Sequence, residues 1–229
     1  MMSRFPSLCY HPSLNPRNVR VAFVWGLSLP DCAETATVPD FLFDILERVR
    51  ASGEDHVSPA RKQAVRGILR YGKFKPSGRS KPSSEYLLRA ALEGNFPLVN
   101  GPVDVNNAIS LEWGYPASIF DLDLCGTSLL LRRGTKGESY VFNSSGQTID
   151  LEDLLCVCRM DRHVWIPCGN PVKDAMSTKI TELTCNVVGV IYAPSSEQGE
   201  DLEKAAKRFF MLLRSDCKAV ECGWAIPES

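Results

Sequence analysis

The stretch DVNNAISLEWGYPASIFDLD, residues 104–123, places a helical pattern, a turn and a cluster of polar side chains next to one another. Its apolar residues recur at helical spacing, which predicts a helix over residues 103–113. Gly114 and Pro116 predict where that helix ends, because glycine adopts the left-handed conformation and proline cannot continue a helix. The stretch contains no histidine and no cysteine. Any chemistry here would depend on carboxylates, carboxamides and a hydroxyl, and the alternative is a structural corner.

The segments on either side of this stretch predict an α+β fold. An apolar, β-rich run over 19–27 predicts a buried strand, and the residues before it are expected to be irregular. Helices are expected over 38–53, 59–71, 83–94 and 200–215, and strands over 127–134, 138–143, 154–159, 163–168 and 185–194. We therefore predict one domain over residues 1–229, with N-terminal helices, a mixed or antiparallel sheet region and a C-terminal helix.

Capping residues and an apolar stripe support these helices. Ser58 followed by Pro59 predicts the start of the second helix, and Ser83 or Ser84 is expected to cap the third. The C-terminal helix carries one apolar stripe, made by Leu202, Ala205, Phe209 and Leu212. This stripe is expected to face the core.

Composition limits the classes of function. The net charge of -1 and the pI near 6.3 argue against a protein that is basic over its whole surface, but a local basic face remains possible. No apolar run approaches the roughly 20 residues that span a bilayer. The first residues lack the apolar centre of a secretory signal. We expect a cytoplasmic protein.

The chain contains nine cysteines, and Cys156, Cys158 and Cys168 lie close together in sequence with His163. Zinc sites usually space their cysteines by two to four residues, whereas the Cys-x-Cys pattern of a strand turns both side chains to one face. We expect reduced cysteines in the core, and we expect no metal and no cofactor. A metal site remains the alternative.

One segment is strongly basic in spite of the neutral total. No acidic residue occurs between Asp55 and Glu85, and eight Lys or Arg residues fall within 61–81. Tyr71 and Phe74 lie among them, and such a mixture suits a polyanion whose bases stack on aromatic rings. The candidate RNA-binding residues are Lys62, Arg66, Arg70, Lys73, Lys75, Arg79 and Lys81. The first three are expected to share a helix face, and the alternative is a solvated helix followed by a loop.

The run VDVNNAISLEWGYPASIFDLDLCG, residues 103–126, resembles the B3/B4 domain of the phenylalanyl-tRNA synthetase beta chain. The family pattern is kept at Asp104, Asn107, Gly114, Pro116, Phe120, Asp121 and Asp123. The runs LLLRRGTKGE and STKITELTCNVVGV look like the strands of that domain that follow. Residues 72–100 are more similar to free-standing members of the superfamily. The resemblance covers roughly residues 58–194.

The resemblance implies an editing function, in which the domain hydrolyses tyrosine wrongly attached to the phenylalanine tRNA. It implies a tRNA with an aminoacylated 3′ end as partner, and an amino-acid-like ligand in the pocket. A chain of 229 residues has no room for the synthetase's other domains, so it is not expected to be a synthetase by itself. The family's histidine after the Gly-x-Pro turn is Ser118 here, its Thr is Asn106, and its arginine is absent near Pro97. A non-catalytic module that binds tRNA or an amino-acid-like ligand is therefore the alternative.

Ester hydrolysis needs a positioned water and donors for the developing oxyanion. The candidate catalytic residues are Asp104, Asn107, Ser118, Asp174, Thr178 and Lys179. For the first two, the alternative is a role in fixing the start of a helix, and for Ser118 it is a loop hydroxyl that bonds its own backbone. Asp174, Thr178 and Lys179 are expected on a loop that faces the pocket, with a surface turn as the alternative. Asp121 and Asp123 are expected to hold a turn, or to pair with Arg132 or Arg133.

Overall fold

The computed structural model describes residues 5–14, 18–195 and 199–228, and within them two sheets form the centre of the molecule. The central sheet has the order β10-β2-β9-β3, and all of its neighbouring strands are antiparallel. The second sheet has the order β1-β4-β7-β8, in which β1 and β4 run parallel. Two further strands, β5 and β6, form a separate hairpin. The α+β class with a mixed sheet region is therefore confirmed.

The strands are β1 (Ser7–Tyr10), β2 (Val19–Leu27), β3 (Ala117–Asp121), β4 (Ser128–Arg133), β5 (Ser139–Val141), β6 (Thr148–Asp150), β7 (Leu155–Asp161), β8 (Val164–Gly169), β9 (Val187–Pro194) and β10 (Glu221–Ala225). The helices are α1 (Asp40–Ser52), α2 (Pro59–Leu69), α3 (Ser83–Leu92), α4 (Gly101–Trp113), α5 (Leu122–Cys125) and α6 (Gly199–Ser215). Three short 3₁₀ turns are η1 (Gly53–His56), η2 (Gly78–Ser80) and η3 (Met176–Thr178).

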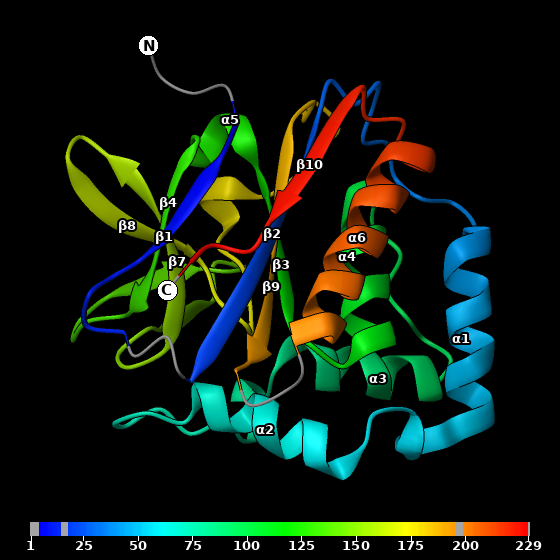
Figure 1. Ribbon diagram of the computed structural model, residues 1–229, viewed down its shortest axis with the longest axis horizontal. Helices are drawn as coiled ribbons and strands as arrows, with labels where there is room; N and C mark the ends of the chain where they lie inside the picture. The colour runs from blue at the N-terminus through cyan, green and yellow to red at the C-terminus, as the bar shows by residue number, and fades with distance from the viewer. Residues whose placement is uncertain (1–4, 15–17, 196–198, 229) are drawn as a thin grey trace.

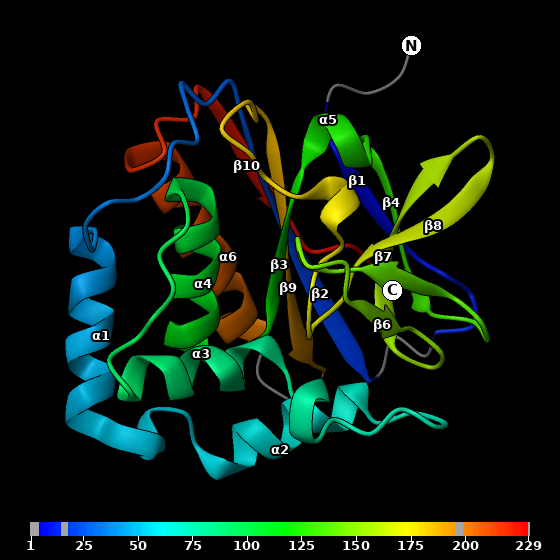
Figure 2. The same ribbon diagram turned by 180° about the vertical axis from the view of Figure 1, so that it is seen from behind.

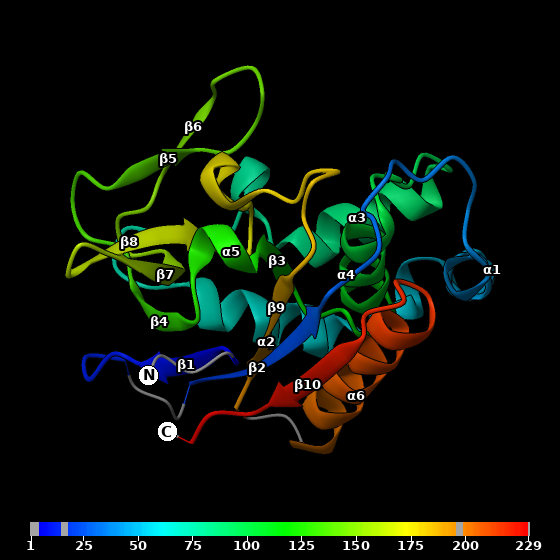
Figure 3. The same cartoon turned by 90° about the horizontal axis from the view of Figure 1, so that it is seen from above.

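The elements form layers around the central sheet (Figure 1). Helices α4 and α6 cover one of its faces, α1 and α3 lie against α4 on the outside, and α2 crosses the lower end of the sheet next to β9 (Figures 1 and 2). Seen from above, the second sheet and the β5–β6 hairpin lie on the other side of the central sheet (Figure 3). This arrangement places α2, α3 and α4 next to the loop that follows β8.

Buried apolar residues fill the spaces between these layers. Between the two sheets, Phe120 and Tyr192 of the central sheet belong to one cluster with Leu131 of the second. Between the central sheet and its helices, Ile109 of α4 and Phe209 of α6 belong to another. The predicted stripe of α6 is buried, which confirms its orientation toward the core.

Local signals explain where several elements begin and end. The hydroxyl of Ser58 accepts a hydrogen bond from the Arg61 N–H at 3.2 Å, and Pro59 opens α2 as predicted. Gly114 ends α4 in the left-handed conformation with φ 69°. A Cβ at Gly114 would lie 2.5 Å from Cγ1 of Val57, so both the conformation and the space require glycine.

Several predictions about elements were wrong. Ser83 and Ser84 lie inside α3 and do not cap it, because the helix begins directly after Pro82. The segment before residue 19, which was expected to be irregular, contains β1, although residues 1–4 and 15–17 lie outside the described part. Strands β3, β6 and β10 were not predicted, and α2 ends at Leu69, before the predicted end at residue 71. Strand β6 has only three residues, and β3 and β10 pair with strands that are distant in sequence, so local periodicity does not reveal them.

The cysteine cluster is part of the core. Cys156, Cys158 and Cys168 are fully buried, free thiols. Burial raises the pKa of Cys158 to about 12, so it stays protonated. His163 lies exposed at the turn between β7 and β8. Among the residues that the structure describes, no group of three His, Cys, Asp or Glu side chains could hold a metal ion, and no helix is long and apolar enough to cross a membrane.

Candidate functional site

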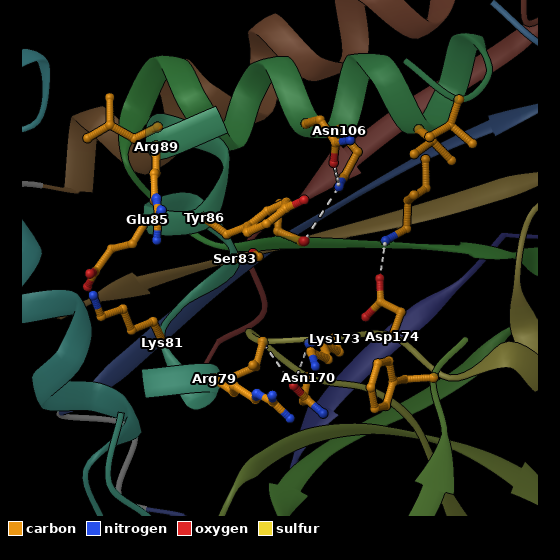
Figure 4. A pocket seen from close by; sticks show the side chains of 18 of the residues that line it. Arg79, Lys81, Ser83, Glu85, Tyr86, Arg89, Asn106, Asn170, Lys173 and Asp174 are labelled. Carbon is orange, nitrogen blue, oxygen red and sulfur yellow. Dashed lines mark hydrogen bonds between the residues drawn. The ribbon is translucent and has the colours of Figure 1, made fainter. Parts of the chain in front are cut away.

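A cavity of about 1100 Å³ opens between helices α2, α3 and α4, strand β3 and the loop over residues 170–180 (Figure 4). Its walls combine apolar side chains such as Val103 and Ile119 with carboxamides and charged groups. A large, mostly apolar cavity with a few convergent polar groups is the usual form of a ligand site. We refer to it as the cavity.

Helix α4 supplies the carboxamides of one wall. The Asn100 side chain caps α4 by accepting a hydrogen bond from the Val103 N–H at 3.2 Å, which fixes where the helix starts. Asn106 and Asn107 then follow on the first turns and line the cavity. Asn106 is buried, and its Nδ2 lies 3.5 Å from the Ala117 carbonyl oxygen. Its buried Oδ1 has no hydrogen-bond partner among the described residues, which leaves an unsatisfied acceptor in this wall.

The loop after β8 supplies charged groups to the opposite wall. The Asn170 side chain accepts hydrogen bonds from the N–H groups of Val172 at 2.8 Å and Lys173 at 2.9 Å, and it also contacts the Tyr140 hydroxyl. This turn brings Lys173 and Asp174 to the cavity. Gly169 lies just before it, where a Cβ would be 2.3 Å from the Phe120 ring. The loop can therefore approach the central sheet closely only through glycine.

Asp174 has the electrostatic surroundings of a reactive carboxyl. Its Oδ2 accepts a hydrogen bond from the Ile119 N–H at 3.2 Å, whereas its buried Oδ1 has no hydrogen-bond partner within the described residues. Burial raises the pKa of Asp174 to about 7, and hydrogen bonding offsets only part of this effect. The carboxyl can therefore gain or lose a proton near neutral pH.

The structure separates the six candidate catalytic residues into two groups. Asn107, Asp174 and Lys179 line the cavity, although they are distant in sequence. Asp104, Ser118 and Thr178 are buried and do not line it. The structure therefore brings together one residue of the opening stretch and two of the loop after β8.

The side chain of each residue in the second group forms a hydrogen bond with a backbone group of another segment. Oδ1 of Asp104 accepts a hydrogen bond from the Val99 N–H at 2.8 Å and so holds the segment that enters α4, and burial raises its pKa. The Ser118 hydroxyl donates to the Asn170 carbonyl oxygen at 3.3 Å and lies 3.0 Å from the Tyr192 hydroxyl. The alternative for Ser118, a loop hydroxyl that bonds its own backbone, is thus wrong, because Ser118 lies in β3 and bonds Asn170 and Tyr192. The Thr178 hydroxyl donates to the Cys168 carbonyl oxygen at 3.3 Å.

The carboxylates that close the opening stretch are structural. Oδ1 of Asp121 accepts hydrogen bonds from the N–H groups of Asp123 at 2.9 Å and Leu124 at 3.2 Å, which caps α5. Asp123 in turn accepts from the Asn186 side chain at 2.9 Å. This confirms the expected turn. Arg132 pairs instead with Glu138 at 2.6 Å.

Four of the candidate RNA-binding residues line the same cavity, namely Lys62, Arg66, Arg79 and Lys81. Arg66 is held by two hydrogen bonds to Glu85, at 2.6 and 2.5 Å, which tie α2 to α3. Lys62 donates to the Glu54 carbonyl oxygen at 2.6 Å. Arg79 and Lys81 are exposed and form no ion pair with any described residue. These two cations are therefore the most available to an anionic ligand.

The remaining basic residues lie away from the cavity. Arg70 follows the end of α2 in an extended conformation, so the prediction that it shares a helix face with Lys62 and Arg66 is wrong. Lys73 pairs with Glu152 at 3.0 Å, which partly neutralises it. Lys75 is exposed and does not line the cavity.

The segment over residues 73–82, which we call the basic loop, is fixed at both ends. At its start, the Lys73 N–H donates a hydrogen bond to Oδ2 of Asp153 at 2.8 Å. Directly after its end, the Ser83 N–H donates to the Pro171 carbonyl oxygen at 2.8 Å. The basic loop is thus joined to the turn before β7 at one end and to the loop after β8 at the other.

Sequence reasoning missed several residues of the cavity. Lys173 lies outside the basic segment, and Phe142 lies on the hairpin, so neither was singled out, yet both line the cavity. The Asn-Pro dipeptide at Asn170 was a signal for a turn that would aim the following residues. The contribution of Phe142 depends on how the hairpin folds over the loop, which no local pattern indicates.

Comparison with known proteins identifies the family to which the chain is similar. The model of the family described as "B3/4 domain" matches residues 71–209. The chain is 27% identical over 176 residues to the phenylalanine–tRNA ligase beta subunit of Cupriavidus pinatubonensis, covering 76% of this chain and 20% of the relative. It is 28% identical over 138 residues to the same subunit of Streptococcus mutans, covering 59% and 16%. It thus spans about a fifth of the length of these relatives.

A solved N-terminal fragment of the phenylalanyl-tRNA synthetase beta-subunit from Pyrococcus horikoshii is similar with a TM-score of 0.46 and 12% sequence identity, over 92% of this chain and 48% of that one. The family match over residues 71–209 extends over more than half of the chain. The chain is therefore a member of the B3/4 domain family, related to the phenylalanyl-tRNA synthetase beta subunit.

Proposed function

We propose that this protein binds tRNA and hydrolyses the ester bond of mischarged aminoacyl-tRNA in trans. The observation that carries the proposal is that cationic side chains and a titratable carboxyl line one cavity. Arg79 and Lys81 suit the phosphates of the tRNA end, and Asp174 suits the ester. The resemblance to the beta subunit supports tRNA as the partner.

The proposed reaction is attack of water on the ester carbonyl. The new C–O bond gives a tetrahedral oxyanion, and the bond to the ribose oxygen then breaks as that oxygen takes up a proton. Asp174 is proposed to accept the proton of the attacking water, because a base is most effective with a pKa near the working pH. Asn107 and Lys179 are proposed as donors to the oxyanion. A hydroxyl of the substrate's ribose can assist the transfer.

The first prediction concerns release of amino acid from a panel of mischarged tRNAs by the purified protein. Release is expected to rise with pH through about 7, as Asp174 loses its proton. Asp174→Asn is expected to lower kcat by about 100-fold or more, the usual contribution of a positioned base. Exposed Asp44 on α1 supplies the matched control, Asp44→Asn, which should retain wild-type rates. Release at only the spontaneous rate across the whole panel would refute hydrolysis.

A second candidate function is a non-catalytic module for tRNA or an amino-acid-like ligand. The observation in its favour is Ser118, which stands where the family has a histidine and is buried behind the cavity wall, bonded to Asn170 and Tyr192. Calorimetric binding of uncharged tRNA or of free amino acids, without any turnover of charged tRNA, would support this candidate over hydrolysis.

A further inference from the structure

A second hollow, of about 1010 Å³, lies between the basic loop and the β5–β6 hairpin. We refer to it as the outer groove. Arg79, Phe142 and Lys173 line both the outer groove and the cavity. Because three residues are shared, the two hollows adjoin and meet at these side chains.

The junction of the two hollows carries two cations without a counterion. Arg79 is exposed, Lys173 is half-buried, and neither forms an ion pair with a carboxylate among the described residues. Figure 4 shows both side chains on the same side of the cavity, next to Asn170. Burial lowers the pKa of Lys173, and the charge of Arg79 lowers it further, so the two cations are close enough to repel. An anion between them would remove this repulsion.

Two aromatic rings line the outer groove, and one of them, Phe142, lies beside these cations. Phe74 belongs to the basic loop and Phe142 to the hairpin connection. The ammonium of Lys173 lies 3.8 Å from the centroid of the Phe142 ring, which orients it at the junction. Cations that follow a groove and aromatic rings that accept stacked bases together favour a single-stranded nucleic acid over an acidic peptide.

The charges of the outer groove become more positive toward the junction. At the far end, Lys73 is paired with Glu152 at 3.0 Å, and Asp150 adds another negative charge. Lys75 is a further cation of the groove, and Arg79 and Lys173, which also line the cavity, lie where the two hollows meet. A polyanion is therefore held most strongly where the groove meets the cavity.

We propose that the outer groove binds a single-stranded polynucleotide, with one of its phosphates held between Arg79 and Lys173 at the mouth of the cavity. This path would lead the unpaired 3′ end of a tRNA to the carboxyl of Asp174. Its identification with a tRNA end rests on the proposed function, whereas binding of the strand itself does not.

The second prediction is tested with an uncharged, fluorescently labelled single-stranded RNA of about 12 nucleotides, within the usual site size of such grooves. Binding is measured by anisotropy over a series of salt concentrations. Arg79→Glu combined with Lys173→Glu is expected to weaken binding at least tenfold. It should also reduce the slope of log affinity against log salt by about 0.7, the value for one lost phosphate contact on a single strand.

A charge-matched control is Lys136→Glu combined with Arg162→Glu, two exposed cations that line neither hollow. It should bind the RNA nearly as the wild type does. Phe142→Ala is expected to weaken binding about fivefold with an unchanged salt slope, because stacking is not ionic. Thermal unfolding of each variant verifies that it is folded.

Three outcomes would overturn the inference: equal effects of the two double variants, equal affinity for a blunt duplex of the same sequence, or equal competition by a poly-glutamate peptide of the same charge. Failure of the proposed function is a different result, in which the wild type releases no amino acid from charged tRNA. The RNA in the binding test is uncharged, so the two failures are distinguishable.

Discussion

The protonation of Asp174 makes the stability of the protein depend on pH, in the same pH range in which its proposed catalytic role depends on pH. The pKa of this carboxyl is raised from 3.8 to about 7 by burial, so the folded state holds the proton more tightly than the unfolded state does. The contribution of Asp174 to stability is therefore most favourable below about pH 4. It falls as the pH rises to about 7 and stays constant above that.

The third prediction follows from this sign. Asp174→Asn removes the cost of burying a charge, so the variant should gain thermal stability relative to the wild type, and the gain should be larger at pH 8 than at pH 5. Thermal unfolding at the two pH values measures it, with Asp44→Asn as the control for the loss of a carboxylate. A gain that does not grow with pH would contradict the raised pKa.

At this scale the sequence located part of the cavity. Asn107, Asp174 and Lys179 were singled out from the motif and from a polar loop, and all three line the cavity. The approach of Lys173 to Arg79 was not foreseeable, because it depends on where a turn at Asn170 places a side chain from another part of the chain. The catalytic roles of Asn107, Asp174 and Lys179 and the RNA-binding role of Arg79 stay predictions.

The α4–β3 connection determines where one wall of the cavity lies. Helix α4 ends at Gly114, and strand β3 begins three residues later, at Ala117. Ala117 and Ile119 of this strand line the cavity. The turn is held in place against Val57, which leaves no room for a Cβ at Gly114. A change at Gly114 should therefore disturb stability and the cavity together.

The fourth prediction compares two glycines with positive φ. Gly114→Ala is expected to cost about 2–4 kcal/mol, from the left-handed conformation together with the clash against Val57. Gly94→Ala also has positive φ, but nothing lies within 4 Å of the added Cβ, so it should cost only about 1 kcal/mol. Urea unfolding measures both. Equal losses would show that the contact with Val57 contributes nothing.

Elements with strong local signals were predicted, and elements defined by pairing were not. The strand over 19–27 and the cap at Ser58 follow from apolar runs and capping chemistry, and both are observed. β3 is buried on both faces, and its apolar and polar residues show no alternation. β1 is four residues long and pairs with a strand more than a hundred residues later. Such strands are determined by tertiary contacts that a local pattern does not contain.

At the scale of the molecule, β1 covers one edge of the second sheet. It pairs with β4, whose other neighbour is β7, and its Leu8 is buried between the sheets. Without β1, the backbone groups of β4 would be unpaired along one edge, and an exposed edge favours pairing with another chain.

The fifth prediction uses this arrangement. Deletion of residues 1–11 should lower the thermal unfolding temperature and produce self-association that increases with concentration, measured by light scattering. Leu8→Ala keeps the backbone pairing, so it should cost about 2–4 kcal/mol of stability without self-association. A deletion variant that remains monomeric would show that the β4 edge is protected in another way.

The α+β class and the family region could be inferred from sequence, because composition, helix signals and one motif all indicated them. The division into two sheets, with helices on one side and a hairpin on the other, could not, since it depends on contacts between distant segments. That arrangement brings the basic segment, residues 61–81, next to the loop over residues 170–180, and the cavity lies between them.

The two fixed ends of the basic loop limit how much its length can change. Its start is bonded to Asp153, and the residue after its end is bonded to Pro171. With both ends fixed, the number of residues between them determines how far Arg79 reaches toward Lys173. Insertion or deletion of a single uncharged residue in the basic loop would keep every charge and yet change the distance between the two cations. Length, as much as composition, is therefore under constraint in this segment.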